Sequence, residues 1–224
     1  DNYYCIITPY YPTGSIRDIM PFYAGRMIPE NTVRCIIGQV LLALQYMHGL
    51  GYCHRDIKPE NILVANWNEV NPKVILCDFG FATQLTDGEF SKEYCGTLDY
   101  VAPEIYFHRP YDNSVDMWSL GVTMHVLLFQ CFPLPQFEDD LPSLKHMLCR
   151  KTVNLTYFRD YEYFDALNLF LELCSYDTCN RITIEDALQH PWIDIETKLS
   201  FPSDSVIQST LSIISTSDTD IAFT

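Results

Sequence analysis

The chain has 224 residues, of which 48% are hydrophobic, and this is enough to bury one substantial core or two small ones. The formal net charge of −15 argues against nucleic acid and anionic membrane surfaces as main partners, and it would attract basic peptides. An acidic surface that only keeps the protein in solution is the simpler explanation for most of these charges.

No apolar run is long enough to span a membrane, and the first residues lack the basic start and apolar run of a signal peptide. The nine cysteines form no C-x-x-C pair and no zinc-ligand spacing with histidine. We therefore expect a soluble protein of the cytoplasm or the nucleus, with reduced thiols.

The first predicted element is a strand at residues 3–8, which are mostly aromatic or β-branched. Pro9 is expected to end it. A helix follows, because seven apolar residues recur at helical spacing and form one face. They are Val33, Ile36, Ile37, Val40, Leu41, Leu44 and Met47. Gly49 and Gly51 are expected to stop this helix.

Two short apolar runs, at residues 62–64 and 74–77, predict strands that are joined by a polar turn at residues 66–72. Asn61 and Asp78 flank these strands. A hairpin here would therefore place the two side chains close together.

Helices are also predicted in the second half of the chain. Residues 116–129 are apolar almost all round, which indicates a helix buried on every side, and residues 165–174 predict another. A further helix should begin near Thr183, because its hydroxyl and Asp186 three residues on resemble a capping box. After Lys198 there is no basic residue and much Ser, Thr and Asp, so we expect a disordered tail.

Three short motifs follow one another along the chain. Residues 54–61 read H-R-D-I-K-P-E-N, residues 78–80 read D-F-G, and residues 102–104 read A-P-E. In this order, and with this Asp-to-Asn spacing, they resemble the catalytic loop, the metal site and the end of the activation segment of a eukaryotic protein kinase. The resemblance implies a mainly α fold with short β hairpins, that of the large C-terminal lobe of a kinase.

The same resemblance divides the chain into three parts. Residues 1–13 would be the last strand of the small lobe and the hinge, and residues 14–195 the large lobe. Residues 196–224 would be the acidic, Ser/Thr-rich tail, which we expect to be disordered.

The resemblance assigns phosphoryl-transfer roles to four residues. Asp56 would orient the substrate hydroxyl and accept its proton, and Lys58 would reach the transferred phosphate. Asn61 and Asp78 would hold magnesium, which prefers carboxylate and amide oxygens. The implied cofactors are ATP and Mg²⁺, and the alternative is a solvated loop with ordinary salt bridges.

The branch of the family is indicated by two positions. The lysine at position 58, two residues after Asp56, resembles the serine/threonine branch. Thr97 matches the threonine that contacts the catalytic Asp and Lys in that branch. This argues against tyrosine as the substrate. Residues 95–100 (CGTLDY) resemble the Aurora kinases, whereas residues 181–183 and 190–192 resemble the calcium/calmodulin-dependent group, and both assignments stay open.

Three further residues are structural by the same resemblance. Glu104 would pair with Arg181 in a buried ion pair that fixes the activation segment (residues 78–104) to the lobe. Asp116 would anchor the backbone of the catalytic loop. Loss of one partner of a buried pair costs about 3–5 kcal/mol, so such variants would imitate a catalytic defect.

Arg55 usually marks kinases whose activation segment is ordered by a phosphate. The position that is usually phosphorylated falls on Glu93. In this the chain resembles phosphorylase kinase, which also has a glutamate at that place. We expect Glu93 to pair with Arg55 and to order the segment partly, because a carboxylate carries less charge than a phosphate. The alternative is that Glu93 is merely exposed and that Ser91 is the phosphorylated residue.

The nucleotide site would begin at the hinge. Pro9 would offer its carbonyl and Tyr11 its amide N–H to adenine, and Leu63 would lie beneath the ring. Glu60 resembles the acidic residue that receives a substrate arginine, so protein substrates with basic residues near the target are expected. The same residue also occurs in kinases of other preference.

No G-x-G-x-x-G loop and no V-A-I-K segment precede the hinge, so the small lobe that covers ATP is expected to be absent and this chain alone inactive. Ile7, Leu63 and Phe79 would then form an exposed face that needs the missing lobe or a partner. We favour a serine/threonine kinase of which this chain is a part. The alternatives are a non-catalytic kinase-like binding or scaffold module, and a small lobe supplied by another chain.

Overall fold

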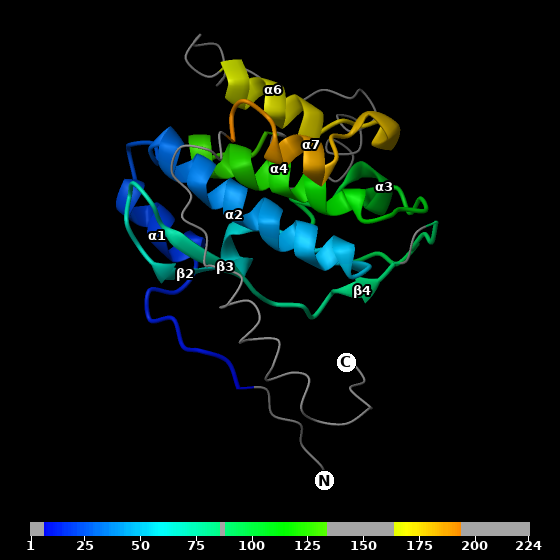
Figure 1. Cartoon of the computed structure of the whole chain (residues 1–224), viewed down its shortest axis with the longest axis horizontal. Helices are drawn as coiled ribbons and strands as arrows, with labels where there is room; N and C mark the ends of the chain where they lie inside the picture. Colours follow the sequence, from blue (N-terminus) through cyan, green and yellow to red (C-terminus); the bar gives the residue numbers. More distant parts are fainter. Residues whose placement is uncertain (1–6, 86–87, 134–163, 194–224) are drawn as a thin grey trace, which may run out of the picture.

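The computed structural model of the chain describes residues 7–85, 88–133 and 164–193. In chain order the described elements are α1 (Ile16–Ile19), the 3-10 helix η1 (Met20–Tyr23), α2 (Glu30–Gly49), β1 (Tyr52–Cys53), η2 (Pro59–Asn61), β2 (Ile62–Asn66), β3 (Lys73–Leu76), β4 (Thr83–Gln84), α3 (Pro103–Tyr106), α4 (Ser114–Phe129), α6 (Phe164–Leu173), η5 (Thr178–Asn180) and α7 (Ile184–Leu188). Helices form the body, and α2 lies between β3 on one side and α4 and α7 on the other (Figure 1).

Helix α2 forms because its apolar residues repeat at helical spacing. It begins at Glu30, directly after Pro29, and ends at Gly49. Six of the seven predicted face residues are buried, and Met47 is half-buried. Gly51 has a φ of 78°, in the left-handed region that glycine adopts easily, which allows the chain to turn into β1.

Helix α4 is the most deeply buried of the described elements, and residues 115–128 within it are all buried, as the sequence predicted. It carries one carboxylate, Asp116, into this core with 0% exposure. A Cβ atom at Gly121 would lie 2.6 Å from the sulfur of Cys174, so only glycine permits this close approach to the end of α6.

Two small antiparallel sheets, the β2–β3 hairpin and the β1–β4 pair, stand beside the catalytic motifs. Strand β2 pairs antiparallel with β3, with Ile62 opposite Leu76, and the N–H of Cys77 donates to the carbonyl of Asn61 at 2.9 Å. Asn61 and Asp78 therefore lie at the same end of the hairpin, as the sequence predicted. Strand β1 pairs antiparallel with β4.

The predicted strand at residues 3–8 lies mostly outside the described residues, and its described part, residues 7–8, is not in a strand. The tail predicted at residues 196–224 lies outside them entirely. Helices α6 and α7 begin at Phe164 and Ile184, close to the predicted positions. The hydroxyl of Thr183 accepts the N–H of Asp186 at 3.2 Å, as expected of a helix cap.

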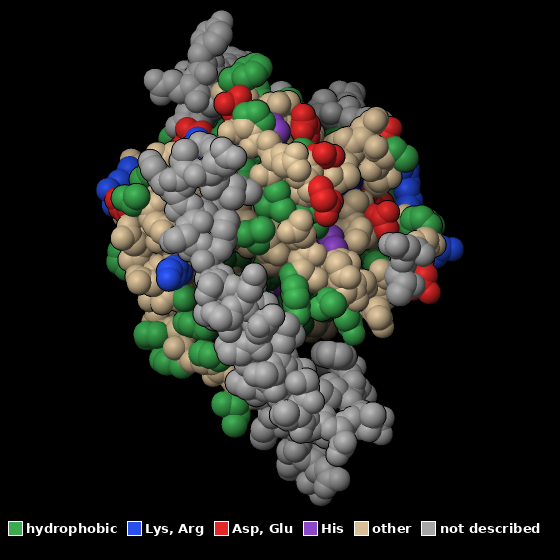
Figure 2. Space-filling view, in the orientation of Figure 1, with side chains coloured by type: hydrophobic (Ala, Val, Ile, Leu, Met, Phe, Trp, Pro, Cys, Tyr) green, Lys and Arg blue, Asp and Glu red, His purple; other side chains and the backbone are tan. Residues whose placement is uncertain are grey.

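The surface carries both acidic groups and exposed apolar side chains (Figure 2). Ile7 is 95% exposed and Phe79 52%, as the sequence led us to expect, whereas Leu63 is half-buried. Within the described part of the chain, no helix has the length and hydropathy needed to cross a membrane.

Candidate active site

Asp116 of α4 binds the backbone of the predicted catalytic loop. The two carboxylate oxygens accept the N–H of His54 at 2.8 Å and the N–H of Arg55 at 2.7 Å. His48 of α2 lies 2.8 Å from the same carboxylate. Burial opposes the charge of Asp116, but the hydrogen bond and charge of His48, with further help from His54, outweigh it and lower the pKa.

The loop and the start of the activation segment are both bent in a strained way. Arg55 has a φ of 68° and Asp78 a φ of 63°, and non-glycine residues rarely adopt such values. Each costs about 1–3 kcal/mol and persists only where surrounding contacts impose it. Two of the sequence-predicted site residues therefore carry strain that the fold maintains.

Asp56 is the centre of a group of donors. Its Oδ2 accepts the ammonium of Lys58 at 2.7 Å and the amide of Asn61 at 2.9 Å. Its Oδ1 accepts the N–H of Thr97 at 3.0 Å and the hydroxyl of Thr97 at 2.7 Å. Lys58 also donates to the Thr97 hydroxyl at 2.7 Å. The loop and the activation segment therefore meet on one carboxylate.

This environment keeps Asp56 ionised. Asp56 is 3% exposed, and burial alone would raise its pKa. The hydrogen bonds of Lys58 and Thr97, the charge of Lys58 and the amide of Asn61 together lower it below its usual value. At neutral pH the carboxylate is an anion, able to orient a hydroxyl group.

Asn61 and Asp78 supply oxygen atoms on neighbouring segments. The amide nitrogen of Asn61 donates to the carbonyl of Asp56 at 2.8 Å as well as to its carboxylate, which leaves the amide oxygen as the atom that can bind a metal. Asp78 is exposed, and one of its oxygens accepts the N–H of Gly80 at 3.2 Å. One carboxylate and one amide oxygen fit magnesium, whose other ligands are typically phosphates and water.

The activation segment contacts Arg55 at two places. The Nε of Arg55 donates to the carbonyl of Phe81 at 2.6 Å, and its Nη1 donates to the carboxylate of Glu93 at 2.8 Å. Ser91 is half-buried, and its hydroxyl accepts the N–H of Glu93 at 3.2 Å. The structure thus brings Arg55 and Glu93 together.

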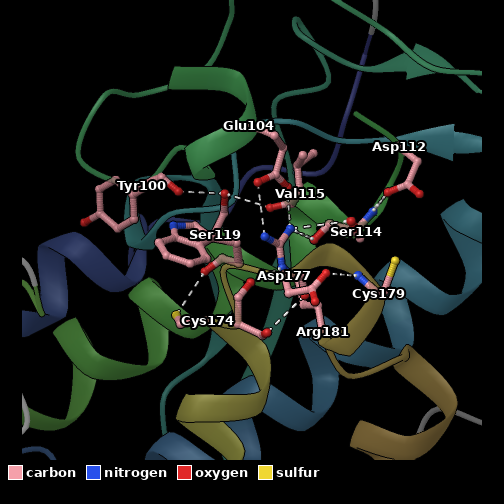
Figure 3. Close-up of polar contacts among 12 residues, drawn as sticks. Tyr100, Glu104, Asp112, Ser114, Val115, Ser119, Cys174, Asp177, Cys179 and Arg181 are labelled. Carbon is pink, nitrogen blue, oxygen red and sulfur yellow. Dashed lines mark hydrogen bonds and ion pairs between the residues drawn. The ribbon is translucent and has the colours of Figure 1, made fainter. Parts of the chain in front are cut away.

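Glu104 and Arg181 form a buried ion pair at the far end of the segment (Figure 3). The two terminal guanidinium nitrogens of Arg181, Nη1 and Nη2, lie 2.5 and 3.1 Å from the two carboxylate oxygens of Glu104. Arg181 also donates to the carbonyl of Ser114 at 3.1 Å, and its guanidinium lies 5.4 Å from the ring of Trp118. The pair ties α3, α4 and the chain before α7 together.

The predicted hinge residues lie on an exposed stretch before α1. Pro9 is exposed and Tyr11 half-buried. The carbonyl of Tyr11 accepts the N–H of Gly14 at 3.1 Å, so its own N–H is the group that can serve a nucleotide. Leu63 lies on β2, and an isolated antiparallel β-bridge between Ser15 and Leu63 joins the stretch before α1 to this strand.

Besides His48, two further residues at the site were not identified from the sequence. Arg17 of α1 lies 3.6 Å from Glu60, the residue predicted to receive a substrate arginine. Tyr111 donates its hydroxyl to the carbonyl of Glu93 at 2.8 Å and accepts from Arg55 at 3.0 Å. Neither lies in a catalytic motif, and their contacts join segments that are distant in the chain.

An ionised aspartate held by lysine, asparagine and threonine, with oxygen donors for a cation beside it, is the arrangement of a phosphotransferase. The family model of the protein kinase domain matches residues 1–193. The chain therefore belongs to the protein kinase family.

Relatives of the chain are protein kinases by name. It is 39% identical over 163 residues to a probable myosin light chain kinase of Dictyostelium discoideum, covering 70% of this chain and 40% of that protein. It is 34% identical over 169 residues to serine/threonine-protein kinase D2 of Homo sapiens, covering 75% of this chain and 19% of that protein. The chain thus spans less than half the length of these relatives.

Proposed function

We propose that the protein transfers the γ-phosphate of ATP to serine and threonine hydroxyls of protein substrates. The observation that carries this proposal is the set of donors converging on Asp56, from Lys58 and Asn61 of the loop and from Thr97 of the activation segment. The name of one relative, serine/threonine-protein kinase D2, supports the choice of serine and threonine. Assignment to the Aurora or the calcium/calmodulin-dependent group stays a prediction.

In the proposed reaction, the substrate hydroxyl oxygen forms a bond to the γ-phosphorus while the bond to the β-phosphate oxygen breaks. ADP leaves with the electron pair of that bond, and the hydroxyl proton passes to the carboxylate of Asp56. Lys58 is placed to stabilise negative charge on the phosphoryl group. Magnesium, when bound by Asn61 and Asp78, would neutralise phosphate charge.

The nucleotide would be held by the hinge and β2. In this proposal the carbonyl of Pro9 and the N–H of Tyr11 bind adenine, and Leu63 contacts its ring. The exposed position of Pro9 and the half-buried position of Leu63 are compatible with these roles.

We propose that Glu93 takes the place of a phosphorylated residue in ordering the activation segment. Its 2.8 Å contact with Arg55 supports this. The side chain of Glu93 is 64% exposed, so solvent weakens the pair, and the ordering it provides is partial.

Substrates with arginine near the target residue are a further part of the proposal. Glu60 would receive that arginine, but Arg17 already lies 3.6 Å from the same carboxylate. The side chains of Arg17 and Glu60 are 57% and 42% exposed, so an arginine of a substrate can displace the first at small cost. We therefore expect a modest preference for basic substrates.

The test is Asp56→Asn in the full-length natural protein that contains this chain. An amide cannot accept the hydroxyl proton, so phosphate transfer from labelled ATP to serine or threonine peptides should fall about 10²–10⁴-fold. Asp165→Asn, an exposed aspartate on α6, is the matched control and should leave the rate unchanged. Undiminished transfer by Asp56→Asn would refute the proposal.

One alternative is a non-catalytic kinase-like binding or scaffold module. The exposure of Ile7 and Phe79, at 95% and 52%, favours it, because apolar groups of that size commonly meet a partner. The phosphate-transfer assay with Asp56→Asn distinguishes the kinase from the scaffold. A scaffold would show no transfer in the natural protein and no dependence on Asp56.

A further inference from the structure

Tyr111 joins the activation segment to the body of the domain through its backbone. It is 2% exposed and lies shortly before α4. The N–H of Ser91 donates to the carbonyl of Tyr111 at 2.9 Å, and the N–H of Tyr111 donates to the carbonyl of Ser91 at 2.9 Å. This antiparallel bridge fixes the position of the chain directly before Glu93.

The side chain of Tyr111 adds a second connection. Its hydroxyl accepts from Nη1 of Arg55 at 3.0 Å and donates to the carbonyl of Glu93 at 2.8 Å. A phenol has one donor and two lone pairs, so both contacts can form together. Burial raises the pKa of Tyr111, which keeps the hydroxyl neutral and able to donate. One buried group therefore holds the catalytic loop and the activation segment at once.

Burial decides which of the two acceptors holds Arg55 more firmly. The carboxylate of Glu93 is charged but 64% exposed, and water competes for it. The hydroxyl of Tyr111 is neutral but lies inside the protein, where a lost hydrogen bond to a charged group is not replaced by water. Burial opposes the charge of Arg55, and the hydrogen bonds of Tyr111 and then Glu93 outweigh it and raise the pKa.

A displacement of Glu93 would affect Asp56, because few residues separate Glu93 from those that contact Asp56 and its loop. Thr97, four residues on, donates both its N–H and its hydroxyl to Asp56. Between them, Gly96 lies so close to the loop that a Cβ atom there would be 2.5 Å from the carbonyl oxygen of Arg55. The segment is thus in direct contact with the loop that carries Asp56.

We propose that Tyr111 is a positioning residue, which holds Arg55 and Glu93 together and thereby keeps Thr97 on Asp56. Its effect on the rate rests on the proposed function, but its effect on the order of the segment does not. Tyr111 is the principal brace of the activation segment, and Glu93 is the weaker, solvent-exposed one.

The first test is Tyr111→Phe in the full-length natural protein, which removes the hydroxyl and keeps the ring. We expect amide hydrogen exchange at Ser91 and Thr97 to become about tenfold faster, and kcat/KM for a peptide to fall about tenfold, with the KM for ATP unchanged. Tyr23→Phe is the matched control, because Tyr23, on η1, is also 2% exposed and its hydroxyl donates to Glu69 at 2.6 Å. It should change neither quantity.

The second test asks whether Tyr111 acts through Arg55. In an Arg55→Lys background, in which the guanidinium contact of Tyr111 is already lost, Tyr111→Phe should cause a smaller further change in exchange at Thr97 than in the parent, because only its hydrogen bond to the carbonyl of Glu93 remains to be removed. Independent, additive effects would overturn the proposal, as would unchanged exchange in Tyr111→Phe alone. If Tyr111→Phe does not fold, Arg55→Lys alone must accelerate amide exchange at Ser91. Exchange as slow as in the parent protein would refute the positioning role of Tyr111.

The two proposals fail in different ways. If the natural protein shows no transfer that depends on Asp56, the proposed function is wrong, and hydrogen exchange still decides the role of Tyr111. If transfer depends on Asp56 but Tyr111→Phe behaves like Tyr23→Phe, only the role of Tyr111 is wrong.

Discussion

Two arginine–glutamate pairs hold the activation segment, and they differ in burial. The pair of Arg181 and Glu104 has two contacts, at 2.5 and 3.1 Å, with side chains that are 0% and 6% exposed. The pair of Arg55 and Glu93 has one contact at 2.8 Å, and the glutamate is 64% exposed. Water cannot replace a partner in the first pair but readily does so in the second. The first pair therefore suits a permanent tie and the second an adjustable one.

The largest effect is expected where the buried pair is broken. Glu104→Gln leaves the charge of Arg181 without a counter-ion inside the protein, which should lower the free energy of unfolding by about 3–5 kcal/mol. Urea unfolding of the natural protein measures this. Glu185→Gln, an exposed position on α7, should stay within about 0.5 kcal/mol of the parent. A comparable small loss for Glu104→Gln would show that the two pairs do not differ as described.

The exposed pair should give a smaller effect, on activity and not on stability. An exposed ion pair contributes about 0.2–1 kcal/mol, so Glu93→Ala should lower kcat/KM for a peptide by at most about fivefold. Salt screens exposed charges, so the difference between parent and variant should shrink as ionic strength rises from about 0.1 to 1 M. A loss larger than that of Tyr111→Phe would reverse the ranking of the two braces.

The smallest effect is expected at a third pair, Arg17 with Glu60, in which both side chains are about half exposed. Arg17→Ala should free Glu60 and raise the preference for an arginine-containing peptide over its alanine counterpart by about two- to fivefold. The ratio of kcat/KM for the two peptides measures this. Arg26→Ala, another exposed arginine near α1, is the control. An unchanged ratio in Arg17→Ala would mean that Glu60 does not receive substrate arginine.

The long elements of the fold were predictable because their burial repeats along the sequence. Helix α2 and helix α4 have apolar patterns many residues long, so their existence followed from periodicity. Helix α4 begins two residues before its predicted range, and α2 begins three residues before Val33, the first residue of its predicted apolar face. Helices α1 and α3 have four residues each, too few for a periodic pattern, and were not predicted. The tertiary contacts around them decide their conformation.

The site was predictable only where it coincides with a motif. Asp56, Asn61 and Asp78 stand at fixed spacings, and the structure brings them to the same end of one hairpin. Tyr111 is one of 15 tyrosines, and its hydroxyl contacts Arg55 across a separation of 56 residues. Nothing local in the sequence distinguishes it. Contacts of this kind depend on how α4 and the activation segment pack.

The buried carboxylate of Asp116 links the order of folding to the order of the site. With 0% exposure, it has no access to water once α4 enters the core, so it needs the N–H groups of His54 and Arg55 as well as His48 of α2. A partly folded state with α4 packed and the catalytic loop loose would leave the buried carboxylate with His48 of α2 but without its two backbone donors. The helix and the loop should therefore form as one cooperative unit, so that a molecule with a completed core also has a completed catalytic loop.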